Sequence, residues 1–156
     1  MRSLLLAFML IVTPSSAQPI TNQTLVLNCL AQIGEETSWE QCRGMIFAPC
    51  QEHKVGTDTH GACLLKQKSE WEAEMQNQQE DLVEKLTPSG NSMLAELMVN
   101  WVSYRATRCS EVAESKSETG KSAKLGCEVT EIAGIAAEFQ ACLEGRSTTP
   151  YCTIKE

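Results

Sequence analysis

The chain has 156 residues, of which 42% are hydrophobic, 21% are charged and 8 are cysteine. This length fits one compact domain and excludes a multidomain machine. With 13 Lys and Arg against 20 Asp and Glu, the net charge is −7 at pH 7. The negative charge argues against nucleic acid and anionic membrane surfaces as partners and favours cationic proteins.

Residues 1–17 have the pattern of a cleavable secretory signal peptide. Arg2 supplies a positive start, residues 4–12 form an apolar run, and small residues end at Ala17, after which we expect cleavage. The run is shorter than the roughly 20 apolar residues that a membrane-spanning helix requires. We therefore predict that residues 18–156 form a single secreted or periplasmic domain, without stable membrane insertion, in an oxidising compartment.

Two short helices are predicted at the start of this domain. The segment Thr24–Ile33 places apolar residues on a broad helical face and is followed by a glycine. Ser38 and Gln41 have the spacing of a capping box, which predicts a second short helix that ends at Pro49. The apolar face of the first helix comprises Leu25, Leu27, Leu30, Ala31 and Ile33.

Three longer helices follow, over about residues 57–86, 91–114 and 121–144. Thr87–Gly90 is the clearest break between them, Asn91 or Ser92 is expected to cap the middle helix, and Gly145 is expected to end the last one. The residues that recur at helical spacing are Leu64, Trp71, Met75, Leu82 and Leu86, then Leu94, Leu97, Met98, Trp101, Val102, Arg105 and Cys109, then Leu125, Val129, Ile132, Ala136, Phe139 and Leu143.

Strand signals are essentially missing, because no period-two run of apolar residues occurs and only 5% of the residues are aromatic. The sequence therefore predicts an all-α bundle of three main helices plus one or two short N-terminal helices. Large apolar side chains are few, so we expect disulfides to staple the bundle and to supply part of its stability.

The cysteine spacing indicates which residues are paired. Two helices joined by a tight turn run antiparallel, so residues equidistant from the turn face each other. The midpoint of every sequential pair falls beside a predicted helix break, but a nested arrangement of Cys42–Cys50 inside Cys29–Cys63 also satisfies this geometry and stays open. The sequential pairs are Cys29–Cys42, Cys50–Cys63, Cys109–Cys127 and Cys142–Cys152.

The same geometry places two charged residues opposite each other across the break at Pro88. Glu72 and Arg105 are equidistant from it, so they are expected to form a charge-assisted bond between two long helices, with Trp71 and Trp101 nearby. We interpret this cluster as structural: the two indoles fill the interface between the helices, and the ion pair fixes the register of one helix against the other. A binding site is the less favoured interpretation.

These residues carry a resemblance to a known family. The stretch Trp101–Cys109, followed by Gly120 and Cys127, resembles the W-x-x-Y-R-x-x-x-C … G … C signature of the LprI-like family, which is named for a mycobacterial lysozyme inhibitor. It includes Tyr104 and Arg105. Upstream, Cys42–Cys63 and Trp71-Glu72 resemble the C-x-G … C … T … C … W-D segment of periplasmic members.

The resemblance covers about residues 42–130 and identifies the chain as a divergent member. Met75, Gln76 and Gln79 stand where the family has Leu, Asn and Tyr, and Met98 replaces a glutamine. Family membership implies the sequential pairing of the cysteines that match Cys50, Cys63, Cys109 and Cys127. It also implies an envelope protein, and for one member the inhibition of lysozyme.

The sequence holds little that predicts an enzyme or a metal site. It has no nucleophile elbow or zinc-protease motif, and the even number of cysteines leaves no free thiol if all are paired. Cys50, His53, His60 and Cys63 form a mirror pattern that could hold zinc, but we favour a disulfide with both histidines in surface loops. Two carboxylate pairs are interpreted as solvated faces: Glu72 with Glu74, and Glu111 with Glu114.

We therefore predict a protein that binds rather than catalyses, with no catalytic residue, cofactor or metal. The favoured partner is a cationic envelope protein such as lysozyme, approached with electrostatic assistance. The alternative is a structural or assembly factor that binds another cell-envelope protein through its amphipathic helices.

Overall fold

The computed structural model describes residues 21–33, 38–116 and 119–155. The predicted signal peptide with its cleavage point after Ala17 lies outside the described residues, as does Gly34. The helices are α1 (Asn22–Leu30), α2 (Trp39–Phe47), the 3-10 helix η1 (Ala48–Cys50), α3 (Asp58–Lys85), α4 (Pro88–Glu114) and α5 (Gly120–Leu143). The described residues contain no strand, only isolated bridge positions such as Leu86 with Ile154, which confirms the predicted all-α bundle.

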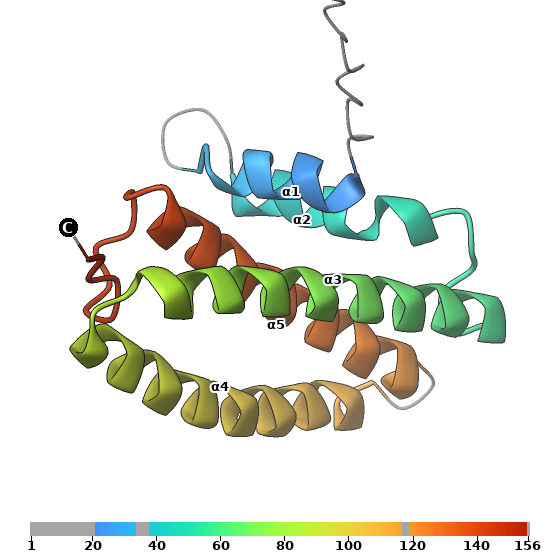
Figure 1. The fold of residues 1–156 in the computed structure, drawn as a ribbon. Helices are drawn as coiled ribbons and strands as arrows, with labels where there is room; N and C mark the ends of the chain where they lie inside the picture. Colours follow the sequence, from blue (N-terminus) through green and yellow to red (C-terminus); the bar gives the residue numbers. More distant parts are fainter. Residues whose placement is uncertain (1–20, 34–37, 117–118, 156) are drawn as a thin grey trace, which may run out of the picture.

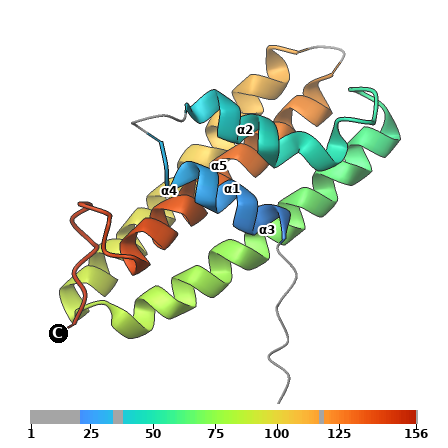
Figure 2. The same cartoon turned by 90° about the horizontal axis from the view of Figure 1, so that it is seen from above.

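α5 is the central helix of the bundle. It packs along α3 and α4 and also contacts α1 and α2. The two short helices pair with each other and cover one side of α3 and α5, while α4 lies on the other side and diverges from α3 away from their shared end (Figures 1 and 2). No helix in the described part of the chain is long and apolar enough to cross a membrane.

Two predicted helix ends are present in the structure. The Ser38 hydroxyl accepts the Gln41 N–H and the Gln41 side chain accepts the Ser38 N–H, so the capping box at the start of α2 is confirmed. At the end of α5, Gly145 adopts φ +71°, and the N–H groups of Gly145 and Arg146 return to the carbonyls of Cys142 and Ala141. This double return satisfies carbonyls that would otherwise lack a partner.

The predicted cap of α4 is wrong. The helix begins at Pro88 rather than near Asn91, and the hydroxyl of Thr87 accepts the Gly90 N–H at 3.2 Å. Proline is favoured at the first helical position because its fixed φ suits the helix and its missing N–H needs no partner there. The break between α3 and α4 is consequently shorter than the sequence suggested, with Leu86 in an extended conformation between the two helices.

The C-terminal segment covers this break. The Thr87 N–H donates to the Thr153 carbonyl at 2.8 Å, and Leu86 and Ile154 form the isolated bridge. The approach is close enough that a Cβ on Gly90 would lie 2.6 Å from the Tyr151 carbonyl oxygen. Residues 151–155 therefore act as a strap across the α3–α4 junction, and we call them the C-terminal strap.

The core consists mainly of the apolar positions that helical spacing predicted. The four on α3 and Leu86 just beyond it are buried, and on α5 all are buried except the half-buried Leu143. The prediction was wrong on α1, where Leu25 and Ile33 are exposed and Val26 is buried instead, and on α4, where Val102 is exposed. α1 and α4 each bury a narrower face than α3 does. The apolar faces predicted for these two helices therefore include residues that are exposed.

All eight cysteines are paired sequentially, not in the nested alternative. The Cα–Cα distances are 5.6 Å for Cys29–Cys42, 5.7 Å for Cys50–Cys63, 5.5 Å for Cys109–Cys127 and 5.6 Å for Cys142–Cys152. The first three staple α1 to α2, η1 to α3 and α4 to α5. The fourth ties the C-terminal strap to α5, so the α3–α4 junction is braced through the strap.

Tyr151 gives the strap a pH-dependent contribution to stability. Burial raises the pKa of its phenol to about 12 from 10.0, and the Glu138 carboxylate adds to the shift. Because the folded-state pKa is the higher one, this contribution is complete below pH 10 and is lost as the pH rises from 10 to about 12. We expect urea denaturation to show a fall of about 2 kcal/mol over that range, which the Tyr151→Phe variant should lack.

Candidate functional site

The motif residues lie where α3, α4 and α5 meet. Trp71 is fully buried in the main core, whereas Trp101 is half-buried at its edge. The Arg105 guanidinium lies 4.6 Å from the centre of the Trp101 ring, and its Nη1 lies 3.9 Å from the Glu72 Oε1. The ion pair expected between Glu72 and Arg105 is therefore present, and Trp101 packs beneath the arginine and against the core cluster that contains Trp71.

This ion pair belongs to a larger charge network. The Lys68 Nζ lies 3.9 Å from the Glu72 Oε1 and 2.8 Å from the Glu128 Oε2, so four charges connect α4, α3 and α5. The Arg105 and Glu128 side chains are only 18% and 14% exposed. We call these four residues the charge network: Lys68, Glu72, Arg105 and Glu128. Their two positive and two negative charges cancel, which limits the free-energy cost of removing partly buried charges from water.

Sequence reasoning missed two members of the charge network. Lys68 precedes Glu72 by one helical turn, and that spacing is itself a signal of an ion pair on one helix face. Glu128 comes from α5 and carried no such signal, since no mirror argument links α3 with α5. Because the charge network is neutral and its members pair with one another, it supports the structural interpretation of Glu72 and Arg105.

Replacing Arg105 with alanine should lower the free energy of unfolding by about 1–2 kcal/mol. The variant loses the cover over Trp101 and leaves the half-buried Glu72 with Lys68 alone. Chemical denaturation of wild type, Arg105→Ala, Glu72→Gln and the double variant measures the coupling between the two side chains. An Arg105→Ala protein as stable as wild type would refute the structural role and revive a binding role.

Tyr104 is the motif residue most accessible to a partner. Its side chain is 52% exposed, and its hydroxyl accepts a hydrogen bond from the Arg108 Nη1 at 3.0 Å. Arg108 in turn pairs with Glu131 of α5 at 2.8 Å. Two exposed valines, Val99 and Val102, lie on the same helix, so the outer surface of α4 carries apolar groups among its exposed charges, which are Glu96, Arg108, Glu111 and Glu114.

The zinc alternative fails because the Cys50–Cys63 disulfide occupies both thiolates that the metal would need. Among the described residues no group of three or more His, Cys, Asp or Glu side chains is placed to hold a metal ion. Of the two histidines predicted in loops, His53 does lie in the loop before α3, but the prediction was wrong for His60, which lies in the first turn of α3 and is half-buried. Together with His53 it lines a cleft of about 360 Å³, the histidine cleft, whose walls include Phe47, Val55 and Leu64.

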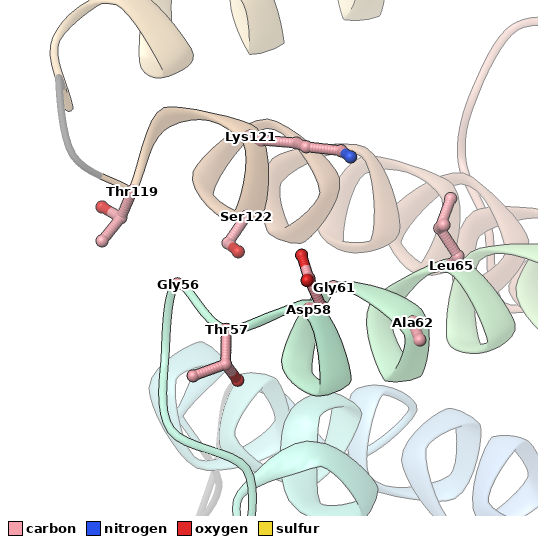
Figure 3. Close-up of a pocket in the computed structure, with 9 residues that line it drawn as sticks. All are labelled: Gly56, Thr57, Asp58, Gly61, Ala62, Leu65, Thr119, Lys121 and Ser122. Atoms are coloured by element: carbon pink, nitrogen blue, oxygen red, sulfur yellow. The ribbon is translucent and has the colours of Figure 1, made fainter.

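A second, smaller cavity of about 200 Å³ lies between the first turns of α3 and α5. Asp58 and Ser122 point toward each other across it, and Lys121 extends along its edge (Figure 3). Its polar lining is one carboxylate, one ammonium group and a few hydroxyls. Neither histidine nor any cysteine lines it.

The two carboxylate pairs do not form a catalytic dyad. Glu72 belongs to the charge network, while the Glu74 carboxylate accepts a hydrogen bond from Gln78 at 3.0 Å. Glu111 and Glu114 are exposed on the last turns of α4. The interpretation as a solvated face therefore fits Glu111 and Glu114, whereas Glu72 and Glu74 are half-buried and each has its own partner.

One outer face of the C-terminal half of α3, here called the acidic groove, is acidic. It carries Gln76, Gln79, Glu80, Val83 and Glu84, all from this one helix. Within the described ranges neither Glu80 nor Glu84 forms an ion pair, and Asp81 lies exposed between them. Lys155 of the strap reaches the backbone carbonyl of Glu84 at 3.1 Å rather than its carboxylate. The sequence analysis did not single out this groove.

Comparisons with models of known protein families, with curated proteins and with solved structures give no significant match to the chain. The fold and site define the class of protein as a small, disulfide-rich helical domain.

Proposed function

We propose that this chain is a secreted or periplasmic domain that binds a cationic protein, with a lysozyme as the first candidate partner. The acidic groove is the observation that carries the proposal. Its two carboxylates, one turn apart on a rigid helix, have amide groups beside them and can receive Lys or Arg side chains of a partner. The surrounding protein has a net charge of −7, which favours encounter with a positive surface.

Two further features support the proposal. The disulfides hold the helices in place before any partner arrives, which limits the entropy lost on docking. The LprI-like pattern at Trp71-Glu72 and Trp101–Cys109 resembles a family in which one member inhibits lysozyme. Membership in that family is part of the proposal.

The test is a titration of the oxidised protein, residues 18–156, into lysozymes of several types while cell-wall hydrolysis is followed. We expect saturable, stoichiometric inhibition that persists at moderate salt. The variant Glu80→Gln/Glu84→Gln should inhibit more weakly, whereas Glu111→Gln/Glu114→Gln, with the same change of charge on α4, should inhibit like wild type. No inhibition, or a weak effect that salt abolishes equally in all variants, would contradict the proposal.

The outer surface of α4 supports a second candidate function, that of an envelope assembly factor. Val99 is 70% exposed and Val102 and Tyr104 are about half exposed, so the helix offers apolar area that the domain itself does not cover. Binding through this surface should survive high salt and should weaken in a Val99→Ser/Val102→Ser variant. Inhibition through the acidic groove should not respond to that variant.

A further inference from the structure

A groove lies between α2 and α4, which flank α5 on opposite sides (Figures 1 and 2). Small residues of α5 line its floor, and its volume of about 410 Å³ is within the usual range for ligand sites. The wall residues recur at four-residue spacing, so one face of each helix forms a wall. We call it the basic groove, and its walls are Trp39, Arg43 and Phe47 on one side and Arg108, Val112 and Lys116 on the other.

The charge of the basic groove is opposite in sign to that of the whole protein. Arg43, Arg108 and Lys116 line it together with one carboxylate, that of Glu131, which leaves a local charge of +2 in a protein with a net charge of −7. Charges farther away than about 10 Å are largely screened at 0.1 M salt. The local charge therefore decides what the groove attracts, and it favours an anion.

Two of the three cations remain available to a ligand. The Arg108 Nε lies 2.8 Å from the Glu131 Oε1, and its Nη1 donates to the Tyr104 hydroxyl, so Arg108 already has partners. Arg43 and Lys116 are exposed, and within the described ranges neither forms an ion pair. The guanidinium of Arg43 presents paired N–H groups that match the two oxygens of a carboxylate.

The wall formed by α2 also restricts the body of the ligand. Trp39 and Phe47 lie one turn before and one turn after Arg43 on the same helix face, so the guanidinium stands between two aromatic rings. Both rings are half-buried, so part of their surface is open to a molecule in the groove. A planar ring can pack against either of them while its charged group meets Arg43.

We propose that the basic groove binds a small aromatic carboxylate. Its carboxylate pairs with Arg43 and Lys116, and its ring lies against the aromatic side chains of α2. The proposal does not rest on the acidic groove, which belongs to the C-terminal half of α3, so inhibition of lysozyme and binding of an aromatic anion can succeed or fail separately.

The experiment compares three probes by following amide chemical shifts of the full, oxidised mature protein. The probes are 2-naphthoate, 2-naphthamide, which keeps the ring without the charge, and acetate, which keeps the charge without the ring. We expect saturable changes for 2-naphthoate in residues 39–47, 108–116 and 123–131. Its affinity should be about tenfold higher than that of 2-naphthamide, because charge-assisted hydrogen bonds are added, and acetate should give no saturable change.

The variant Arg43→Gln tests the assigned contact. Arg43 is exposed and has no ion pair among the described residues, so the variant should fold like wild type. It should lose most of the preference for 2-naphthoate and bind 2-naphthamide unchanged. Lys85→Gln is the matched control: it makes the same change of charge at the end of α3, outside the basic groove, and should leave every affinity as in wild type.

Four results would overturn the proposal. Equal affinities for 2-naphthoate and 2-naphthamide would show that the cations make no contact, and saturable binding of acetate at the same residues would show a site for simple ions. An equal loss in Arg43→Gln and Lys85→Gln would show that only the overall charge matters. Tighter binding of a hexaglutamate peptide than of 2-naphthoate would assign the groove to an acidic protein segment instead.

Discussion

Replacing Trp71 with alanine is expected to lower the free energy of unfolding by about 3–5 kcal/mol, close to the whole stability of many small domains. Trp71 has no exposed surface and belongs to the main core, where α1, α2, α3, α4 and α5 all contribute side chains. The substitution removes the largest buried side chain and leaves a cavity that rigid, disulfide-bonded helices cannot collapse to fill.

Urea denaturation with the disulfides intact measures this loss, and Trp101→Ala is the matched control. Trp101 is half-buried beneath Arg105, so its removal should cost about half as much or less. The Trp71→Phe variant should recover part of the loss because it refills part of the cavity. Equal losses at Trp71 and Trp101 would show that the two indoles contribute equally to the core, against the burial seen here.

Much of this fold follows from local features of the sequence. The spacing of Leu64, Trp71 and Leu82 predicts the buried face of α3, because α3 packs a continuous stripe against α5. The cysteine midpoints favoured the observed pairs, since antiparallel neighbours joined by a short turn bring equidistant residues together, although a nested pairing of the first four cysteines fitted as well. The same reasoning predicted the ion pair between Glu72 and Arg105.

The missed features depend on contacts between elements that no turn connects. The bond from Lys68 to Glu128 requires α3 and α5 to lie side by side, and α4 separates them in sequence. The histidine cleft likewise needs α5 beside the start of α3. The cap at Thr87 was missed for another reason, since Thr87 followed by Pro88 is a local helix-start pattern that was interpreted only as a helix break.

The acidic groove and the histidine cleft differ in how much they depend on the tertiary structure. The acidic groove is formed by consecutive turns of α3, so its residues would be close even in an isolated helix. The histidine cleft is formed only when three segments are held together, in part by the Cys50–Cys63 disulfide. Reduction of the disulfides should therefore disturb the histidine cleft more than the acidic groove.

Removing the Cys142–Cys152 disulfide, by changing both residues to alanine, should lower the free energy of unfolding by about 2–3 kcal/mol. The expected loss comes from the freed chain entropy of a loop with a sequence separation of 10. The change should also weaken the hydrogen bonds that hold the C-terminal strap against the α3–α4 junction. Thr153 bonds to Thr87 through both its carbonyl and its hydroxyl, and the Lys155 N–H bonds to the Lys85 carbonyl at 2.8 Å.

Hydrogen exchange separates this local effect from general destabilisation. In the variant, the amides of Thr87 and Lys155 should exchange faster than those at the centre of α5, whereas wild type should protect them. Removing Cys29–Cys42 instead, with a sequence separation of 13, should cost a similar free energy but leave the Thr87 amide protected relative to the core. If the Thr87 amide stays protected without Cys142–Cys152, the hydrogen bonds alone hold the strap, and the disulfide contributes only by constraining the unfolded chain.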